Sequence, residues 1–127
     1  MLSSAEVYPT LPVIDLARSR KFYEGILGLV VENDSMNGMV LYKTGTGTRL
    51  MTFTRPPTKA DHSVASFVVD DIKQTVQELT AKGVVFEQYD MGNGIKTDDD
   101  GILAVGEAKA AWFKDTEGNI LALNQKT

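Results

Sequence analysis

The feature that most constrains this chain is a repeated pair of helix boundaries. Asp15 and Asp71 each precede an amphipathic segment and lie 56 positions apart. An aspartate there can cap a helix, because its carboxylate accepts hydrogen bonds from the free backbone N–H groups of the first turn. Gly28 and Gly83 follow the two segments, 55 positions apart, and suit the left-handed conformation that ends many helices. The same start and stop signals therefore occur twice in the same order.

Strand-like sequences repeat around these helices. G-L-V-V-E at Gly28–Glu32 is echoed by G-V-V-F-E at Gly83–Glu87, and Tyr42–Met51 aligns with Phe113–Ala122 at an offset of 71. The offset grows by 16 between these two pairs, which predicts a long insertion in the second copy at about Tyr89–Lys109. The sequence thus predicts a duplicated βαβββ unit.

Each copy is expected to contain four strands and one helix. The elements predicted for the first copy are a helix from the Asp15 cap to about Leu27 and strands at Val7–Ile14, Leu29–Glu32, Met39–Lys43 and Thr48–Thr54. Those of the second copy are a helix between Asp71 and Gly83, a turn at Asp115–Gly118, and strands at Val64–Val69, Val84–Gln88, Ala110–Lys114 and Asn119–Asn124.

The connector between the copies is predicted at Arg55–Asp61, because Pro56 and Pro57 continue neither a ladder nor a helix. The predicted fold class is α+β. We expect one domain, spanning 1–127, with two tandem βαβββ modules at about 7–55 and 62–125.

Composition narrows the class of function. With 43% hydrophobic and 24% charged residues the chain resembles soluble globular proteins, and it has no apolar run near the roughly 20 residues that span a bilayer. The absence of cysteine removes disulfides, thiolate catalysis and cysteine-ligated zinc. A net charge of −4 without a Lys/Arg cluster argues against nucleic-acid binding. No targeting segment is recognised, so we expect a cytoplasmic location.

The opening V-I-D-L-A-R-S-R-K-F-Y-E-G-I-L-G-L, its weaker echo, and the closing W-F-K-D-T-E-G-N-I-L-A-L resemble the vicinal oxygen chelate superfamily. That group includes the glyoxalase I, bleomycin-resistance and extradiol-dioxygenase-like proteins. The resemblance runs from about Tyr8 to Gln125. It implies two βαβββ modules whose mixed sheets curl into a cup, usually in a homodimer, and its motifs are specific for the fold rather than for an activity.

In the family's metalloenzymes the floor of the cup holds a divalent metal on His, Gln or Glu side chains. Carried over by position, the resemblance places Tyr8, Met51, Val64 and Ala122 where those ligands would stand. A protonated phenol, a soft thioether and two alkyl groups do not suit a hard cation. A register shift of one residue would bring in Val7, Thr52, Ser63 or Leu123, which are little better. We therefore expect no metal and no other cofactor.

Alternation along the strands predicts which side chains face the cup. The candidate ligand-binding residues are Tyr8, Thr10, Arg49, Met51, Phe53, Val64, Ser66, Ala122 and Asn124, with Trp112 as a candidate wall residue. Arg49 either holds a carboxylate or phosphate or extends its guanidinium into solvent. Trp112 and Tyr42 are equally compatible with packing. A mostly apolar and aromatic cup suits a small organic ligand.

His62 is the only histidine and a weak candidate for a catalytic group. We interpret it as an exposed loop residue, with a general base or a stray metal ligand as the alternative. The run Asp98–Gly101 lacks EF-hand spacing and is interpreted as a solvated loop or as a lid over the cup.

The leading hypothesis is a metal-independent protein that binds or sequesters a small, partly apolar molecule in a cup shared by a homodimer. The alternative is a lyase, isomerase or dioxygenase-like enzyme with a non-standard site, such as His62 with Glu107 or Asp90. A third class is an interaction module whose cup is filled by its own side chains. At this point the chain is not assigned as an enzyme.

Overall fold

The computed structural model describes residues 2–126, which form two compact units with a boundary between Lys59 and Ala60. This boundary falls within the connector predicted around Pro56 and Pro57. Each unit contains one four-stranded mixed sheet and one main helical segment. The predicted α+β class with two βαβββ modules is therefore confirmed. Among the described residues, no helix is long and apolar enough to cross a membrane.

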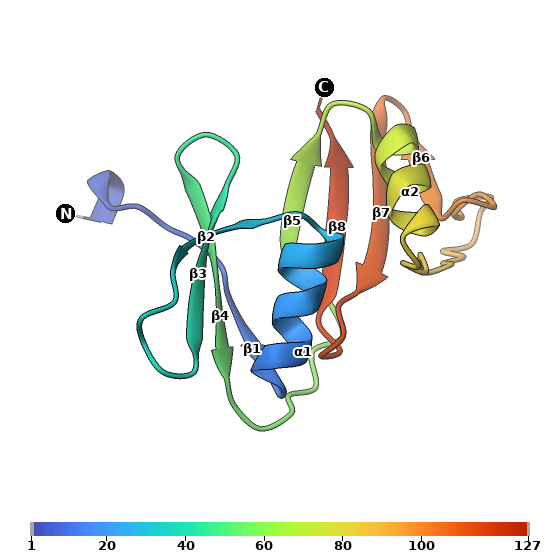
Figure 1. The fold of residues 1–127 in the computed structure, drawn as a ribbon. Helices are drawn as coiled ribbons and strands as arrows, with labels where there is room; N and C mark the ends of the chain where they lie inside the picture. Colours follow the sequence, from blue (N-terminus) through green and yellow to red (C-terminus); the bar gives the residue numbers. More distant parts are fainter. Residues whose placement is uncertain (1, 127) are drawn as a thin grey trace. The chain divides into compact units, whose positions relative to one another are not determined.

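The first unit contains one sheet of strand order β1-β4-β3-β2, in which β1 is parallel to β4 and the other pairs are antiparallel (Figure 1). Its strands are β1 (Thr10–Val13), β2 (Val30–Asn33), β3 (Met39–Thr44) and β4 (Thr48–Thr54). Its helical elements are η1 (Leu2–Ser4), α1 (Leu16–Arg20) and the π-helical η2 (Lys21–Ile26). The strand predicted at Val7–Ile14 is shorter than expected, because Pro9 has no N–H to donate to a ladder.

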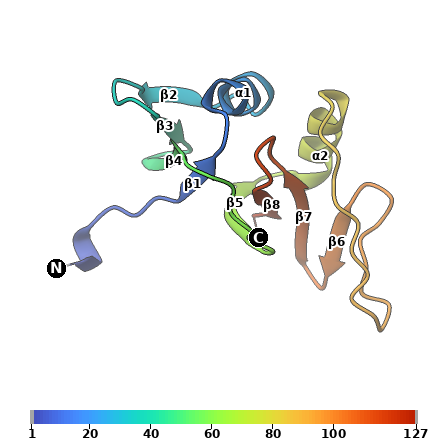
Figure 2. The same ribbon diagram turned by 90° about the horizontal axis from the view of Figure 1, so that it is seen from below.

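The second unit repeats this arrangement, with the sheet order β5-β8-β7-β6 and β5 parallel to β8. Its elements are β5 (Ser63–Val69), α2 (Ile72–Ala81), β6 (Ile102–Val105), β7 (Ala108–Lys114) and β8 (Ile120–Gln125). The helix α2 packs against β7 and β8, as Figure 2 shows.

Both predicted helix caps are confirmed. The carboxylate of Asp15 accepts a hydrogen bond from the backbone N–H of Arg18 at 3.0 Å, and that of Asp71 accepts one from Gln74 at 3.1 Å. Both caps have extended backbone, as an N-cap requires. The two aspartates that the sequence repeats therefore make the same capping hydrogen bond in both units.

The strand predicted at Val84–Gln88 is wrong as an element. Only Phe86 reaches the sheet as a bridge, to Phe113, and the neighbouring N–H of Glu87 donates to the carbonyl of Trp112 at 2.8 Å. The remaining edge of β7 pairs with β6, which lies in the segment predicted as the insertion. The second unit therefore has β6, from the insertion, at the position where the repeat predicted the strand Val84–Gln88.

The repeat offsets nevertheless hold at this point. Val31 pairs with Tyr42 in the first unit, and Phe86 pairs with Phe113 in the second. These pairs are related by the offsets of 55 and 71 that the sequence shows. Phe86 therefore has the pairing position that Val31 has in the first unit, although the residues around Phe86 form no strand.

Alternation gives each sheet one buried face and one partly open face. The buried face carries Leu11, Val13, Val40, Tyr42, Leu50 and Thr52 in the first sheet and Ala111, Phe113, Leu121 and Leu123 in the second. Ala122, Ile102 and Leu103 of the second sheet are buried as well. Tyr23 of η2 stacks on Tyr42 with 6.0 Å between ring centroids, so the buried face of the first sheet is the one that meets the helical segment. Phe67 and Val69 of β5 are half-buried.

Thr52 allows a stability prediction for this core. Its side chain is fully buried, and no described protein group hydrogen-bonds its hydroxyl. We expect Thr52→Val to raise the free energy of unfolding by about 1 kcal/mol, because it removes a buried polar group without a partner while keeping the shape. Denaturant unfolding measures the change.

The matched control is Thr54→Val, an exposed position in the same strand, which should change stability by less than about 0.5 kcal/mol. A loss of stability in the Thr52 variant would show that its hydroxyl is hydrogen-bonded in solution and would contradict the prediction.

Candidate functional site

The open face of the first sheet carries a hollow of about 170 Å³, which we call the first hollow. It is lined by Tyr8, Asn33, Met36, Met39, Leu41 and Met51. Leu41 of β3 is paired with Met51 of β4, at positions that alternate with the buried ones. Methionine side chains are flexible and polarisable, so a wall with three of them adapts to apolar ligands of different shape.

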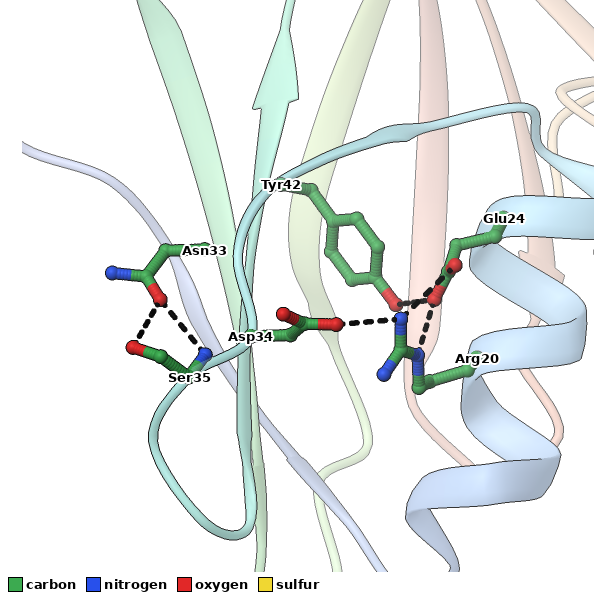
Figure 3. Close-up of polar contacts among 6 residues, drawn as sticks. All are labelled: Arg20, Glu24, Asn33, Asp34, Ser35 and Tyr42. Carbon is green, nitrogen blue, oxygen red and sulfur yellow. Dashed lines mark hydrogen bonds and ion pairs between the residues drawn. The ribbon is translucent and has the colours of Figure 1, made fainter.

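Asn33, the last residue of β2, and Met36, in the loop that follows, reach this hollow. The side-chain oxygen of Asn33 accepts hydrogen bonds from the backbone N–H and the hydroxyl of Ser35, at 2.9 and 2.7 Å (Figure 3). The next residue, Asp34, accepts a hydrogen bond from Nη2 of Arg20 at 3.2 Å. The hydrogen bond from Arg20 to Asp34 therefore ties the start of this loop to the helical segment.

Arg20 is itself fixed by Glu24, whose Oε2 lies 2.6 Å from the arginine Nε and also accepts from the hydroxyl of Tyr42 at 3.0 Å. Burial and the hydrogen bond to Glu24 raise the pKa of Tyr42 well above its usual value. Tyr42 is fully buried and stacked on Tyr23, so it is a packing residue rather than part of a ligand wall. Its network links the helical segment to the loop of the first hollow.

Arg49 was predicted either to hold an anionic ligand or to reach into solvent. Its Nε donates to Glu32 at 2.7 Å and its Nη1 donates to Glu6 at 2.8 Å. The hydrogen bond to Glu32 and the charges of both carboxylates raise the pKa of Arg49. The guanidinium thus faces two carboxylates of its own unit, which disfavours an external carboxylate or phosphate as its partner.

The second sheet carries a hollow of about 230 Å³, which we call the second hollow. It is lined by Asp61, His62, Ser63, Tyr89, Met91, Trp112 and Ile120. Trp112 lies on the open face of β7, and its ring meets that of Tyr89 edge to face, with 5.4 Å between centroids. Trp112 is therefore on the ligand side of its sheet, one of the two roles that the sequence left open.

A β-bulge changes the register of β5 in this hollow. The resemblance places Val64 of β5 at a metal-ligand position, and the pairing of β5 with β8 shifts register between Ser63 and Ala65. Ser63 consequently pairs with Ile120, and both line the second hollow. A bulge inserts one unpaired residue, and Val64 is the residue of β5 that has no partner in β8.

The predicted ligand residues thus separate into three groups. Tyr8 and Met51 line the first hollow, and Trp112 lines the second together with the candidate His62. Those that line neither hollow are Thr10, Arg49, Phe53, Val64, Ser66, Ala122 and Asn124. Their contact with a ligand remains a prediction.

Sequence reasoning missed lining residues of two kinds. Met39 and Leu41 could have been found, because alternation along β3 places them on the same face as Met51 of the neighbouring strand. Met36, Tyr89 and Met91 come from loops, where no periodic signal exists.

His62 is exposed, and its Nδ1 lies 3.2 Å from the backbone carbonyl oxygen of Ser63. Within residues 2–126 it makes no hydrogen bond to Asp90 or Glu107, the partners considered for an enzymatic site. The side chain of Asp90 instead accepts from the N–H of Gly92 at 2.9 Å.

The residues at the family's metal positions do not fit a hard divalent cation. Tyr8 and Met51 stand at those positions in the first unit, and Ser63, Ile120 and Ala122 stand at or beside them in the second. A phenol, a thioether, one hydroxyl and alkyl groups form a poor donor set for such an ion. In the described part of the chain, no three His, Asp or Glu side chains are gathered at one point.

The duplicated module and its two open sheet faces define a known class of proteins. The model of the Glyoxalase/Bleomycin resistance protein/Dioxygenase superfamily matches residues 7–123. This chain belongs to that superfamily. A search of curated protein sequences gives no significant match.

Solved structures of similar fold include proteins of different kinds. One is TnmS3, an antibiotic binding protein from Streptomyces sp. CB03234, with a TM-score of 0.73 and 22% identity over 100% of this chain and 99% of that one. Another is a lactoylglutathione lyase from Agrobacterium tumefaciens, with a TM-score of 0.69 and 18% identity over 96% of this chain and 93% of that one. At these identities the likeness establishes the fold alone.

Proposed function

We propose that this protein binds a small, partly apolar organic molecule on the open faces of its sheets and sequesters it without a metal ion. The observation that carries the proposal is the lining of the two hollows, which combines apolar, thioether and aromatic groups with a few polar ones. Such a lining is typical of sites for organic ligands.

The repeat supports a shared role for the two hollows. Leu41 in the first corresponds to Trp112 in the second at the offset of 71. Leu41 pairs with a residue of β4, and Trp112 pairs with a residue of β8, the equivalent strand. The volumes of about 170 and 230 Å³ are below the roughly 300–1,000 Å³ of sites for drug-sized ligands. Each hollow therefore suits one ring system or one arm of a larger ligand.

The likeness to the antibiotic binding protein TnmS3 directs the choice of compounds, because it shows that this fold serves binding in at least one neighbour. We propose an antibiotic-like organic compound as the ligand class, and a homodimer in the cytoplasm as the working form. The residues on the open faces outside the hollows, Thr10, Phe53, Ser66, Ala122 and Asn124, are proposed as further contacts for a ligand that exceeds one hollow.

The single tryptophan provides a local reporter for the test. We expect an aromatic antibiotic panel that includes bleomycin to contain compounds that change Trp112 fluorescence and raise the melting temperature together. A ligand at 100 times its dissociation constant should add about 2.7 kcal/mol to the free energy of unfolding. The control is Trp112→Phe, which should abolish the fluorescence response and retain a thermal shift.

Three outcomes would contradict the proposal. The absence of a thermal shift with every compound would favour the interaction module. Recovery of a chemically altered compound after release would favour the enzymatic alternative. About one equivalent of zinc, nickel, manganese or iron retained after dialysis would contradict metal independence.

A further inference from the structure

We infer that the second hollow selects an organic cation, namely a quaternary ammonium or protonated amine group, through the aromatic corner of Tyr89 and Trp112 and the carboxylate of Asp61. This inference deepens the proposed function and rests on it. It concerns the second hollow alone.

The aromatic corner is the first element of the site. The rings of Tyr89 and Trp112 are inclined by 77° to one another, with 5.4 Å between centroids, and both line the hollow. Two rings in contact at nearly a right angle form a corner in which a group can meet a face of each ring. Aromatic faces attract cations electrostatically, and ammonium groups are recognised in this way. The polarisable thioether of Met91 extends the same wall.

The charge around the corner is negative. Asp61 lines the hollow, and within residues 2–126 its carboxylate has no ion-pair or hydrogen-bond partner. The lining contains no Lys or Arg, and His62 is its only other ionisable group besides Tyr89. Asp61 is therefore available as the counter-ion of a bound cation.

Tyr89 remains a neutral aromatic wall in this setting. Its partial burial, and secondly the negative charge of Glu87, raise the pKa of its phenol. Glu87 faces one cation of its own unit, since Lys114 Nζ lies 3.7 Å from its Oε1 with the lysine side chain more than half exposed. That contact is long and solvated, so it screens the carboxylate only in part.

The first hollow provides an internal contrast. Its residue equivalent to Trp112 is Leu41, and it has no counterpart of Tyr89 or Met91, because both come from the insertion in the second copy. No charged side chain lines it. The duplicated unit thus carries the cation-selective features in one copy only.

Choline and 3,3-dimethylbutan-1-ol test this inference directly. The two molecules have the same shape, but the alcohol has a neutral carbon in place of the quaternary nitrogen. At pH 8, above the range in which histidine usually ionises, both are titrated against 15N-labelled protein while the single indole N–H resonance, that of Trp112, is followed by NMR. We expect choline to bind about three- to thirty-fold more tightly than the alcohol.

Variants separate the two parts of the site. Asp61→Asn should weaken choline binding about two- to five-fold and leave the alcohol unaffected, whereas the exposed control Asp99→Asn, with the same change in net charge, should alter neither. Tyr89→Leu should remove most of the preference for choline, and Tyr89→Phe, which keeps the ring, should retain it. Retention also excludes a general loss of structure at this position.

The outcomes distinguish this inference from the proposed function. Equal binding of choline and the alcohol, or a choline preference that is unchanged in both Asp61→Asn and Tyr89→Leu, would overturn the inference while leaving the binding function in place. If neither probe shifts the Trp112 resonance and the antibiotic panel gives no thermal shift, both are overturned. A shift with the panel but with neither probe overturns the inference alone.

Discussion

Replacing Gly101 with alanine is expected to lower the free energy of unfolding by about 3 kcal/mol, one of the two largest effects that we predict for this chain. Gly101 has φ +88°, a conformation that costs an L-residue roughly 1 kcal/mol or more. In addition, a Cβ at this position would lie 2.7 Å from Cβ of Phe86. Phe86 is buried and forms the bridge to Phe113, so it cannot move away freely.

The matched control is Gly106→Ala in the turn between β6 and β7. Gly106 also has a positive φ, of +60°, but an added Cβ there would have no neighbour within 4 Å. Its cost should therefore be limited to the backbone strain, about 1 kcal/mol. Urea unfolding of both variants gives the comparison, and equal losses would show that contact with Phe86 does not contribute.

The second large effect is expected at Asp115, in the turn between β7 and β8. Its side chain is only 6% exposed. Oδ1 accepts hydrogen bonds from the backbone N–H groups of Glu117 and Asn119, each at 2.8 Å, and Oδ2 accepts from Nδ2 of Asn119 at 2.8 Å. Asp115→Ala removes the acceptor of these three hydrogen bonds from a buried turn. We expect a loss of about 3 kcal/mol in the free energy of unfolding.

Asp98→Ala is the control for this prediction. The carboxylate of Asp98 likewise accepts from two backbone N–H groups, those of Asp100 and Ile102, both at 2.9 Å, but Asp98 is exposed. Water can replace an exposed acceptor, so a loss of only about 1 kcal/mol is expected. Similar losses for the two variants in chemical denaturation would mean that burial of Asp115 does not strengthen its role.

The sequence-based expectations succeeded where the signal is local. The residue type alone identifies Asp15 and Asp71 as helix caps. The sequence Asp115–Gly118 likewise identifies the turn after Lys114. Each depends on hydrogen bonds to residues two to four positions away, so neighbours in the sequence determine them.

The candidate site was predicted less completely, because it depends on register and on loops. The spacing of residues along β5 gives no sign of the register shift between Ser63 and Ala65. Alternation identified the face on which Tyr8, Met51 and Trp112 lie, but it contains no information about which loop residues approach that face.

The sequence by itself determined the duplication and the α+β class, because these follow from residue type and spacing, and its motifs carried the resemblance to the superfamily. Only the tertiary structure decided that Arg49 faces Glu6 and Glu32 and that the insertion replaces an edge strand. It also decided that Tyr89 meets Trp112. Glu6 and Arg49 are 43 positions apart, and Tyr89 and Trp112 are 23 apart. Contacts of this range depend on how strands and loops pair in space, for which a single sequence carries no periodic signal.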